Sequence, residues 1–250
     1  NADTNVPPQQ QLSSLLEYYQ TGQYGDAEKL AKSITQQFPQ HQFAWKVLGA
    51  VLKQTGRITD SLTPMQKSVQ LMPQDAGAQN NLGTTLQELG RLDEAEACYK
   101  QAIVSEPDLA EAHYNLGTTL QELGRFDEAE ACYKQAIVLE PDYVDAHYNL
   151  GILLHDMGRF DEAEASYNQA IALKPDYAEA MFNISITQNY MNNLEAEIVS
   201  LQNVLRIDSD DYGLRAGVNL AICNFLKGDF AESKKFLLAA AKIQEKTSSA

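Results

Sequence analysis

The chain has 250 residues, of which 44% are apolar and 21% are charged, and its formal net charge at pH 7 is -15. The apolar content is sufficient for a folded core, which excludes disorder over most of the chain. The negative charge argues against binding of DNA, RNA or an anionic membrane, because nucleic-acid binding depends on basic side chains that displace counterions. No apolar run approaches the roughly 20 residues that cross a bilayer, so no membrane segment is predicted.

The N-terminal segment and the cysteines bear on cellular location. The first residues lack the basic and apolar blocks of a signal peptide, and we predict that residues 1–7 form a flexible tail. Because the chain does not begin with Met, earlier removal of a leader stays an alternative. The cysteines Cys98, Cys132 and Cys223 form no close pair, which fits reduced thiols and favours a cytoplasmic location.

The sequence repeats itself with a period of 34 residues. Proline and glycine mark this period, at Pro39, Pro73, Pro107, Pro141 and Pro175 and at Gly49, Gly83, Gly117 and Gly151. The segments 83–108 and 117–142 are nearly identical, which a duplication explains. In chain order we assign an array over 8–250 with repeats at 8–41, 42–75, 76–109, 110–143, 144–177, 178–213 and 214–247.

Each repeat is predicted to be a pair of antiparallel helices, as the fourth repeat illustrates. Apolar residues recur there at helical spacing, at Ala112, Leu116, Leu120 and Leu123 and again at Ala129, Tyr133, Ala136 and Ile137. Gly124 can take the positive φ of the turn between the helices, and Pro141 ends the second helix. Asp108 and Asp127 are each followed three residues later by a glutamate, so both are predicted to cap a helix.

Small residues are expected where the two helices of a pair cross. Gly117 and Ala129 occupy these places, and large side chains such as Tyr133 fill the space around them. The pattern resembles the tetratricopeptide repeat (TPR) family through His113, Leu116, Gly117, Leu120, Ala129, Tyr133, Ala136 and Pro141. The resemblance implies an all-α fold, a right-handed superhelical solenoid of about seven TPR repeats, since one pair cannot bury its apolar faces alone.

Two repeats depart from the pattern. The first has Ser14-Leu15 where Leu-Gly is usual, and the sixth has Ile184-Ser185 there and Asn192 in place of the turn glycine. Asn tolerates the left-handed conformation, so we expect that turn to persist. The sixth repeat also carries two extra residues near 208–213, where we expect a looser turn.

The TPR resemblance implies a concave groove lined by the first helix of each repeat. The sixth position of that helix is asparagine in five consecutive repeats: Asn81, Asn115, Asn149, Asn183 and Asn219. This series resembles the asparagine ladder in the TPR arrays of O-linked N-acetylglucosamine transferase, where amides hold a peptide main chain. An Asn amide offers a donor and an acceptor together. The alternative is that these amides bond locally or face water. Further predicted peptide-binding residues are Tyr114, Tyr148, Thr118, Gln121 and His155.

The last repeat differs in character from the middle ones. Its groove positions are apolar, at Val218, Ile222, Phe225 and Leu226, and its second helix contains the run FLLAAAKI. This end is therefore expected either to bind a hydrophobic anchor of a ligand or to be covered by a following segment. We favour coverage, because the ends of a solenoid need a polar cap for solubility.

No catalytic, cofactor-binding or metal-binding constellation is predicted, so the chain is not expected to be an enzyme by itself. His113 and His147 recur at a position that packs between helices, and no HxxxH or CxxC spacing supports a zinc site. The Glu-Ala-Glu triplets that begin at Glu94, Glu128 and Glu162 recur in repeat after repeat, which indicates a solvated face rather than an acid–base pair.

Three functions are therefore considered. The first is a protein-interaction scaffold that binds an extended segment of a protein or peptide in the groove. The second is the substrate-recognition arm of a larger enzyme, such as a glycosyltransferase, whose catalytic domain lies outside this chain. The third is a scaffold that self-assembles through its C-terminal end.

Overall fold

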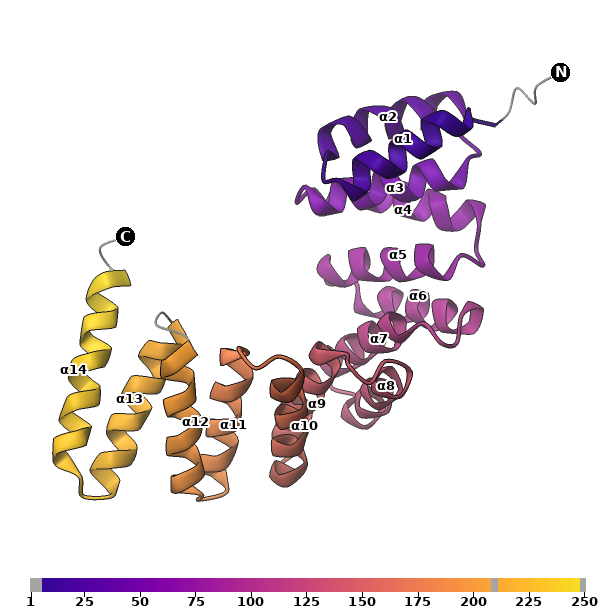
Figure 1. Cartoon of the computed structure of the whole chain (residues 1–250). Coiled ribbons are helices and arrows are strands. Elements are labelled where there is room, and N and C mark those ends of the chain that lie inside the picture. The colour runs from indigo at the N-terminus through magenta and orange to yellow at the C-terminus, as the bar shows by residue number, and fades with distance from the viewer. Residues whose placement is uncertain (1–5, 208–210, 248–250) are drawn as a thin grey trace. The chain divides into compact units, whose positions relative to one another are not determined.

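The computed structural model describes residues 6–207 and 211–247, which form fourteen helices and no strand (Figure 1). The chain divides into two compact units, Asn1–Leu139 (unit 1) and Glu140–Ala250 (unit 2). Unit 1 contains α1 (Gln9–Gln20), α2 (Tyr24–Gln37), α3 (Gln42–Gln54), α4 (Ile58–Leu71), α5 (Ala76–Glu88), α6 (Leu92–Ser105), α7 (Ala110–Glu122) and α8 (Phe126–Leu139). Unit 2 contains α9 (Val144–Asp156), α10 (Phe160–Leu173), α11 (Ala178–Tyr190), α12 (Leu194–Ile207), α13 (Asp211–Leu226) and α14 (Phe230–Thr247).

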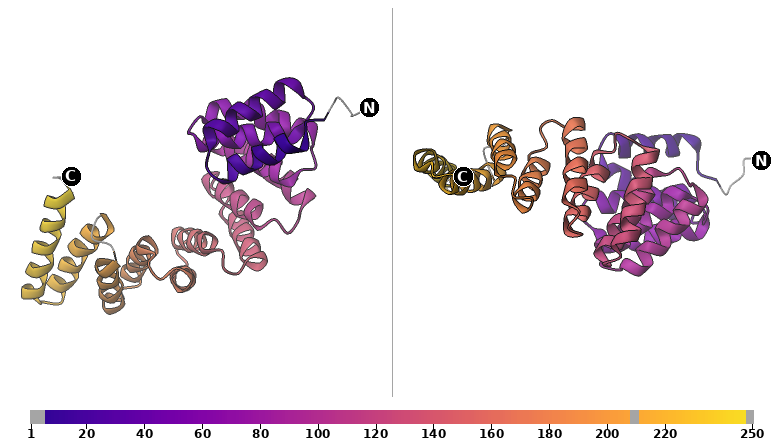
Figure 2. Two further views of the ribbon diagram at one scale, coloured as in Figure 1. Left: turned by 45° about the horizontal axis from the view of Figure 1, so that its top comes forward. Right: turned by 90° about the horizontal axis from the view of Figure 1, so that it is seen from below.

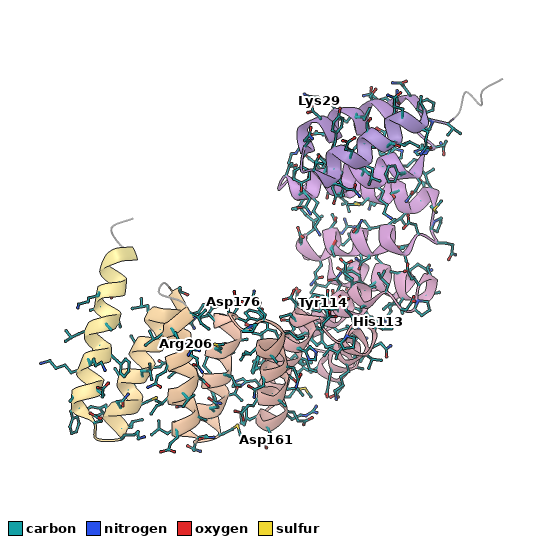
Figure 3. The ribbon with its side chains drawn as sticks, viewed as in Figure 1. Lys29, His113, Tyr114, Asp161, Asp176 and Arg206 are labelled. Carbon is teal, nitrogen blue, oxygen red and sulfur yellow. The ribbon has the colours of Figure 1, made fainter. Side chains whose placement is uncertain are left out.

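Each odd-numbered helix packs against the even-numbered helix that follows it, as the two views of Figure 2 show. Within each unit, consecutive pairs also stack, for example α4 on α5 and α12 on α13. In Figure 3, Asp161 and Asp176 mark the opposite ends of α10, where the chain enters and leaves that helix. The predicted all-α helical-repeat fold is confirmed.

The repeated glycine of each first helix makes room for an aromatic ring. A Cβ built on Gly117 would lie 2.8 Å from Cδ1 of Tyr133, and one built on Gly83 would lie 2.6 Å from Cε1 of Tyr99. Both rings are fully buried. The glycine is therefore needed because a tyrosine of the second helix lies across it. This contact explains why a small residue recurs at the predicted helix crossing.

The turns inside the pairs have the predicted backbone. Gly124 has a φ of 74°, and Asn192 has a φ of 56° in the sixth repeat, where it is the one non-glycine residue with positive φ in the described part of the chain. Asparagine is one of the few residues that tolerate this region, so the substitution preserves the turn.

The predicted helix caps are wrong. α7 begins after Leu109, which makes no side-chain cap bond, and Asp127 lies inside the first turn of α8. Side-chain caps occur instead where a polar residue occupies the residue immediately before a helix: Asp75 accepts from the backbone N–H of Ala78, Asn193 from Ala196 and Asp229 from Glu232. In the fourth repeat, Asp108 lies one residue before the capping place of α7, and Asp127 lies two residues after the capping place of α8.

The extra residues of the sixth repeat extend a helix. α13 begins at Asp211 and has 16 residues, whereas α11 has 13. Within the segment 208–213 where we expected a looser turn, 211–213 form the first turn of α13, and 208–210 lie outside the described residues. The predicted repeat boundary after 213 therefore falls inside this helix. Of the predicted tail 1–7, residues 1–5 also lie outside the described residues, and Pro7 is buried.

Second helices are linked by ion pairs from one repeat to the next. Arg125, the residue before α8, donates to both carboxylate oxygens of Glu96 at 2.8 Å and to Glu128 in the first turn of α8, and Arg57 reaches Glu28 of the preceding repeat. The first glutamate of each triplet is exposed, as predicted, but the second is not: the side chain of Glu96 is only 12% exposed. The solvated-face interpretation therefore holds for half of these carboxylates.

The histidines that the sequence singled out have structural partners. Nε2 of His113 and Nε2 of His147 each lie 2.9 Å from the carbonyl oxygen of the proline six residues earlier, Pro107 or Pro141. Trp45 and Gln79 donate to Pro39 and Pro73 in the same way in the second and third repeats. This position therefore ties the first helix to the loop that precedes it.

Candidate functional site

The first (odd-numbered) helices of the repeats carry a hollow in each unit, and we call the side of these helices that bears it the inner face. In unit 1 a hollow of about 470 Å³, the unit 1 hollow, lies between α5 and α7. Its lining is Lys53, Thr84, Gln87, Glu88, Tyr114, Asn115, Thr118 and Glu122. Figure 3 labels Tyr114 beside His113 on α7. Three residues predicted from sequence as peptide-binding, Tyr114, Asn115 and Thr118, are thus together in one surface depression.

In unit 2 a smaller hollow of about 200 Å³, the unit 2 hollow, lies between α11 and α13, with one residue from α12. Its lining is Ile186, Asn189, Glu197, Asn219, Ile222, Cys223 and Leu226. The predicted ladder residue Asn219 lies here, with two of the apolar C-terminal positions, Ile222 and Leu226. Glu197 was not predicted.

The two hollows use corresponding places of the repeat. Thr84 and Ile186 are the ninth residues of their repeats, Gln87 and Asn189 are the twelfth, and Asn115 and Asn219 are the sixth. The hollows differ in polarity: Lys53 pairs with Glu88 at 3.0 Å beside the first, whereas isoleucine and leucine dominate the second. The same fold positions therefore form two depressions of different chemical preference.

Two of the ladder asparagines are bound to the preceding repeat. Nδ2 of Asn115 donates to Oδ1 of Asn80 at 3.0 Å, and Nδ2 of Asn183 donates to the hydroxyl of Tyr148 at 2.8 Å. Asn80 and Tyr148 occupy the same place, the fifth residue of the preceding repeat. A bond between repeats thus accounts for part of the asparagine periodicity, as the local alternative supposed. Each amide retains one N–H and its carbonyl oxygen.

The other ladder positions are half-buried. The backbone carbonyl of Asn81 accepts from the hydroxyls of Thr84 and Thr85, while Asn149 lies on α9 and Asn219 lies on α13 at the unit 2 hollow. The structure therefore places one predicted ladder residue in each hollow, Asn115 and Asn219. Contact of the five amides with a peptide remains a prediction.

Gln121 and Tyr148 have internal roles. Oε1 of Gln121 accepts from the hydroxyl of Tyr133 at 2.8 Å, so this amide orients a core ring. Tyr148 is 7% exposed and packs on Tyr177 with ring centroids 4.9 Å apart. Burial, followed by a hydrogen bond to Glu179, raises the pKa of Tyr148. Both residues thus have partners within the fold, and their contact with a peptide remains a prediction.

His155 belongs to an aromatic cluster that the sequence did not reveal. Its Nδ1 lies 2.9 Å from Oγ1 of Thr187, whose hydroxyl also donates to the carbonyl of Asn183, so Nδ1 carries the hydrogen. The ring stands edge-on to Tyr190 at 5.1 Å, and Tyr190 stacks on Phe160 at 5.4 Å. Tyr190 is 61% exposed. Because these residues come from three helix ends, helical periodicity alone could not group them.

The surroundings of Cys98 and Cys132 disfavour the thiolate form. Burial, and then the charge of Glu94 or Glu128, raises the pKa of Cys98 and of Cys132 to about 11. Within the described residues no group of three or more histidine, cysteine or acidic side chains could hold a metal ion. No helix in that part of the chain is long and apolar enough to cross a membrane.

Comparison with protein families identifies the repeat. Two family models, both described as tetratricopeptide repeat, match the chain, one at residues 74–139 and the other at 114–178 and 150–186. These matches cover the middle repeats, where the signature residues are most regular. A search of curated proteins gives no match.

Solved structures share the fold at low sequence identity. A tetratricopeptide repeat protein from Parabacteroides merdae is 17% identical with a TM-score of 0.67, and the match covers 94% of this chain and 93% of that one. PilF of Pseudomonas aeruginosa is 17% identical with a TM-score of 0.68, covering 84% and 97%. YrrB, described as a TPR protein with an unusual peptide-binding site, is 20% identical with a TM-score of 0.60, covering 71% and 92%. The chain thus contains tetratricopeptide repeats over residues 74–186 and shares its helical-repeat fold with these solved structures.

Proposed function

We propose that this TPR protein is an interaction scaffold whose inner helix faces bind extended segments of partner proteins. The observation that carries the proposal is the correspondence between the two hollows, because both open at the sixth, ninth, twelfth and thirteenth residues of their repeats. YrrB, which shares the fold, is described as having a peptide-binding site, and this supports the choice of a peptide ligand.

The chemistry of the unit 1 hollow suits an extended backbone. Asn115 retains one amide N–H and a carbonyl oxygen after its bond to Asn80, so it can still pair with one peptide unit. Thr118 and Gln87 add further polar atoms at 3.3 Å from each other. Each such hydrogen bond contributes only about 1 kcal/mol net, so affinity must come from several contacts and from side chains that enter the hollows.

The experiment uses the full chain and peptides that are selected for binding to it. Dodecapeptides are selected from a random display library, and their binding is measured by fluorescence anisotropy. Thr118→Arg fills the unit 1 hollow and Ile222→Arg fills the unit 2 hollow. We expect one or both to weaken binding of the selected peptides by about tenfold or more.

Matched controls place the same substitutions on second helices. Thr59 is exposed on α4, and Val199 is 56% exposed on α12, close to the 53% of Ile222. Thr59→Arg and Val199→Arg should leave affinity unchanged. Equal affinity in all four variants would reject the inner faces as the binding surface.

A second candidate function, self-association through the C-terminal repeat, rests on exposed apolar side chains. Leu237 and Leu238 on α14 are 51% and 56% exposed, and Phe225 and Phe230 are 58% and 63% exposed. Large exposed apolar side chains that cluster favour contact with another protein surface. Sedimentation velocity should then show a concentration-dependent dimer that Leu237→Lys together with Leu238→Lys abolishes; a monomer at every concentration would refute it.

A further inference from the structure

A single carboxylate interrupts a column of small core residues. The twentieth residue of each repeat lies on the second helix of its pair and is small in six of the seven repeats: Ala27, Ser61, Ala95, Ala129, Ala163 and Ser233. Four of these alanines and Ser61 are fully buried, and Ser233 is 6% exposed. In the sixth repeat the residue is Glu197, which is only 5% exposed.

Burial of this carboxylate is unfavourable without compensation, since a buried charge needs a partner charge or several hydrogen bonds. Oε2 of Glu197 accepts from Nδ2 of Asn189 at 3.0 Å, and the thiol of Cys223 also donates to this carboxylate. No cationic side chain among the described residues lies within ion-pair distance of it. Two neutral donors thus hold a negative charge whose counter-charge the described part of the chain does not supply.

The carboxylate borders the unit 2 hollow. Glu197 is part of the lining, and Ile186, Ile222 and Leu226 form apolar walls around it. The carbonyl oxygens of Asn189 and Asn219, which line the same hollow, add neutral acceptors. A hollow lined by apolar side chains, one carboxylate residue and two amide side chains matches an aliphatic stem that ends in an ammonium group, because an ammonium has three donors and its methylenes favour apolar surroundings.

We infer that the unit 2 hollow is a binding pocket for a lysine side chain of the partner segment, with Glu197 as the residue that selects its charge. A lysine fits better than an arginine because the pocket offers one buried carboxylate and a volume of about 200 Å³, without a second acidic side chain in its lining. The inference rests on the proposed function, in that the inner face must bind a peptide, and it adds the side chain that unit 2 recognises.

The test uses a probe that needs only the pocket. Nα-acetyl-lysine methylamide is titrated into the full chain and followed by the amide NMR signals of Ile186, Asn219 and Ile222. The norleucine compound, which has the same stem without the ammonium group, is titrated in parallel. We expect the lysine compound to bind about tenfold more tightly than the norleucine compound, and Glu197→Gln to remove this difference.

A matched control separates pocket charge from net charge. Glu195 lies on the same helix with its side chain 88% exposed, so Glu195→Gln should leave the preference for lysine intact. Glu197→Ala restores the small residue of the other repeats, and we expect it to raise the melting temperature while it abolishes the preference. That combination shows that the loss of binding does not come from loss of the fold.

Two results would overturn the inference: equal binding of the lysine and norleucine compounds, or unchanged lysine preference in Glu197→Gln. Either can occur while the selected dodecapeptides still bind and respond to Thr118→Arg, in which case the proposed function stands without this pocket. Conversely, a Glu197-dependent preference in a chain that selects no peptide would reject the proposed function and the partner segment, and would leave a pocket for an alkylammonium group.

Discussion

The ring of Tyr133 occupies the space that a side chain on Gly117 would need, since a Cβ at Gly117 would lie 2.8 Å from two of its ring carbons. Tyr133 is fully buried and its hydroxyl is held by Gln121, so the ring cannot swing out without loss of that bond. The pair therefore sets the distance between α7 and α8.

Gly117→Ala should destabilise the protein by about 1–3 kcal/mol, because overpacking forces the ring or the backbone to move. Gly25→Ala is the control: Gly25 lies in α2 with no atom within 4 Å of a Cβ and no positive φ. That substitution should stabilise by roughly 0.5–1 kcal/mol, since alanine loses less entropy in a helix. Urea unfolding of both variants measures the change in the free energy of unfolding relative to the wild type. A change of the same sign in both variants would contradict the packing argument.

Asn115→Ala should cost about 1–3 kcal/mol, because the carbonyl of Asn80, which is 2% exposed, would lose its donor. A double-mutant cycle with Asn80→Ala should show a coupling of at least about 0.5 kcal/mol. Additive costs would mean that the bond contributes nothing, and the periodic asparagines would then need another explanation. Because this amide has a structural role, its removal is a poor test of peptide binding.

Arg57→Gln should raise the pKa of Glu28. The hydrogen bond from Arg57, and then that from Lys32, lowers the pKa of this carboxyl from its ordinary 4.5 to about 2. A pKa depressed in the folded state stabilises the protein above the ordinary value, and this stabilisation is lost as pH falls from about 5 towards 2. The difference in unfolding free energy between the wild type and Arg57→Gln should therefore shrink over that window.

The carboxyl signal of Glu28 in an NMR titration measures this directly. Arg91→Gln is the matched control, because Arg91 pairs with Glu94 three residues later and the preceding repeat has Leu62 at the place that Glu28 takes in the first repeat. It should leave the Glu28 titration unchanged. A Glu28 pKa that stays near 2 in Arg57→Gln would assign the shift to another cause.

Cys98 and Cys132 should react slowly with iodoacetamide at pH 8. The thiolate is the nucleophile, and a pKa raised from 9.0 to about 11 lowers the thiolate fraction at this pH about 100-fold. Mass spectrometry of a time course should show alkylation that accelerates as pH approaches 11. The same reaction in concentrated urea should proceed at the rate of an unfolded peptide; rapid alkylation of the native chain would contradict the burial.

Much of the fold could be predicted because the 34-residue period carries its own turns and crossings. Gly124 and Asn192 were identified from their residue types alone, and both have positive φ. The helix caps were not predicted correctly. A capping aspartate must be the residue immediately before the helix, and the spacing of apolar residues does not place a helix start to within one residue. The added turn of α13 escaped prediction for the same reason, because two inserted residues can extend a helix or lengthen a loop.

The candidate site was only half predictable. Positions on the first helices led to Asn115 and Asn219 at the two hollows, but the partner of Asn115 lies one repeat earlier at Asn80, and no spacing within one helix reveals it. Glu197 could have been found by comparing the repeats residue by residue, since it is the one charged residue in a column of alanine and serine. The aromatic cluster around His155 could be recognised only from the three-dimensional structure.

The third and fourth repeats contain the same internal bond, from Tyr99 to Gln87 at 3.0 Å and from Tyr133 to Gln121 at 2.8 Å, within nearly identical sequence. If the gene loses or gains one such 34-residue segment, the new junction joins nearly identical sequences, and the contacts within each helix pair are kept. The number of inner-face positions can thus change in whole repeats, so the length of the inner face is open to evolution by unequal recombination.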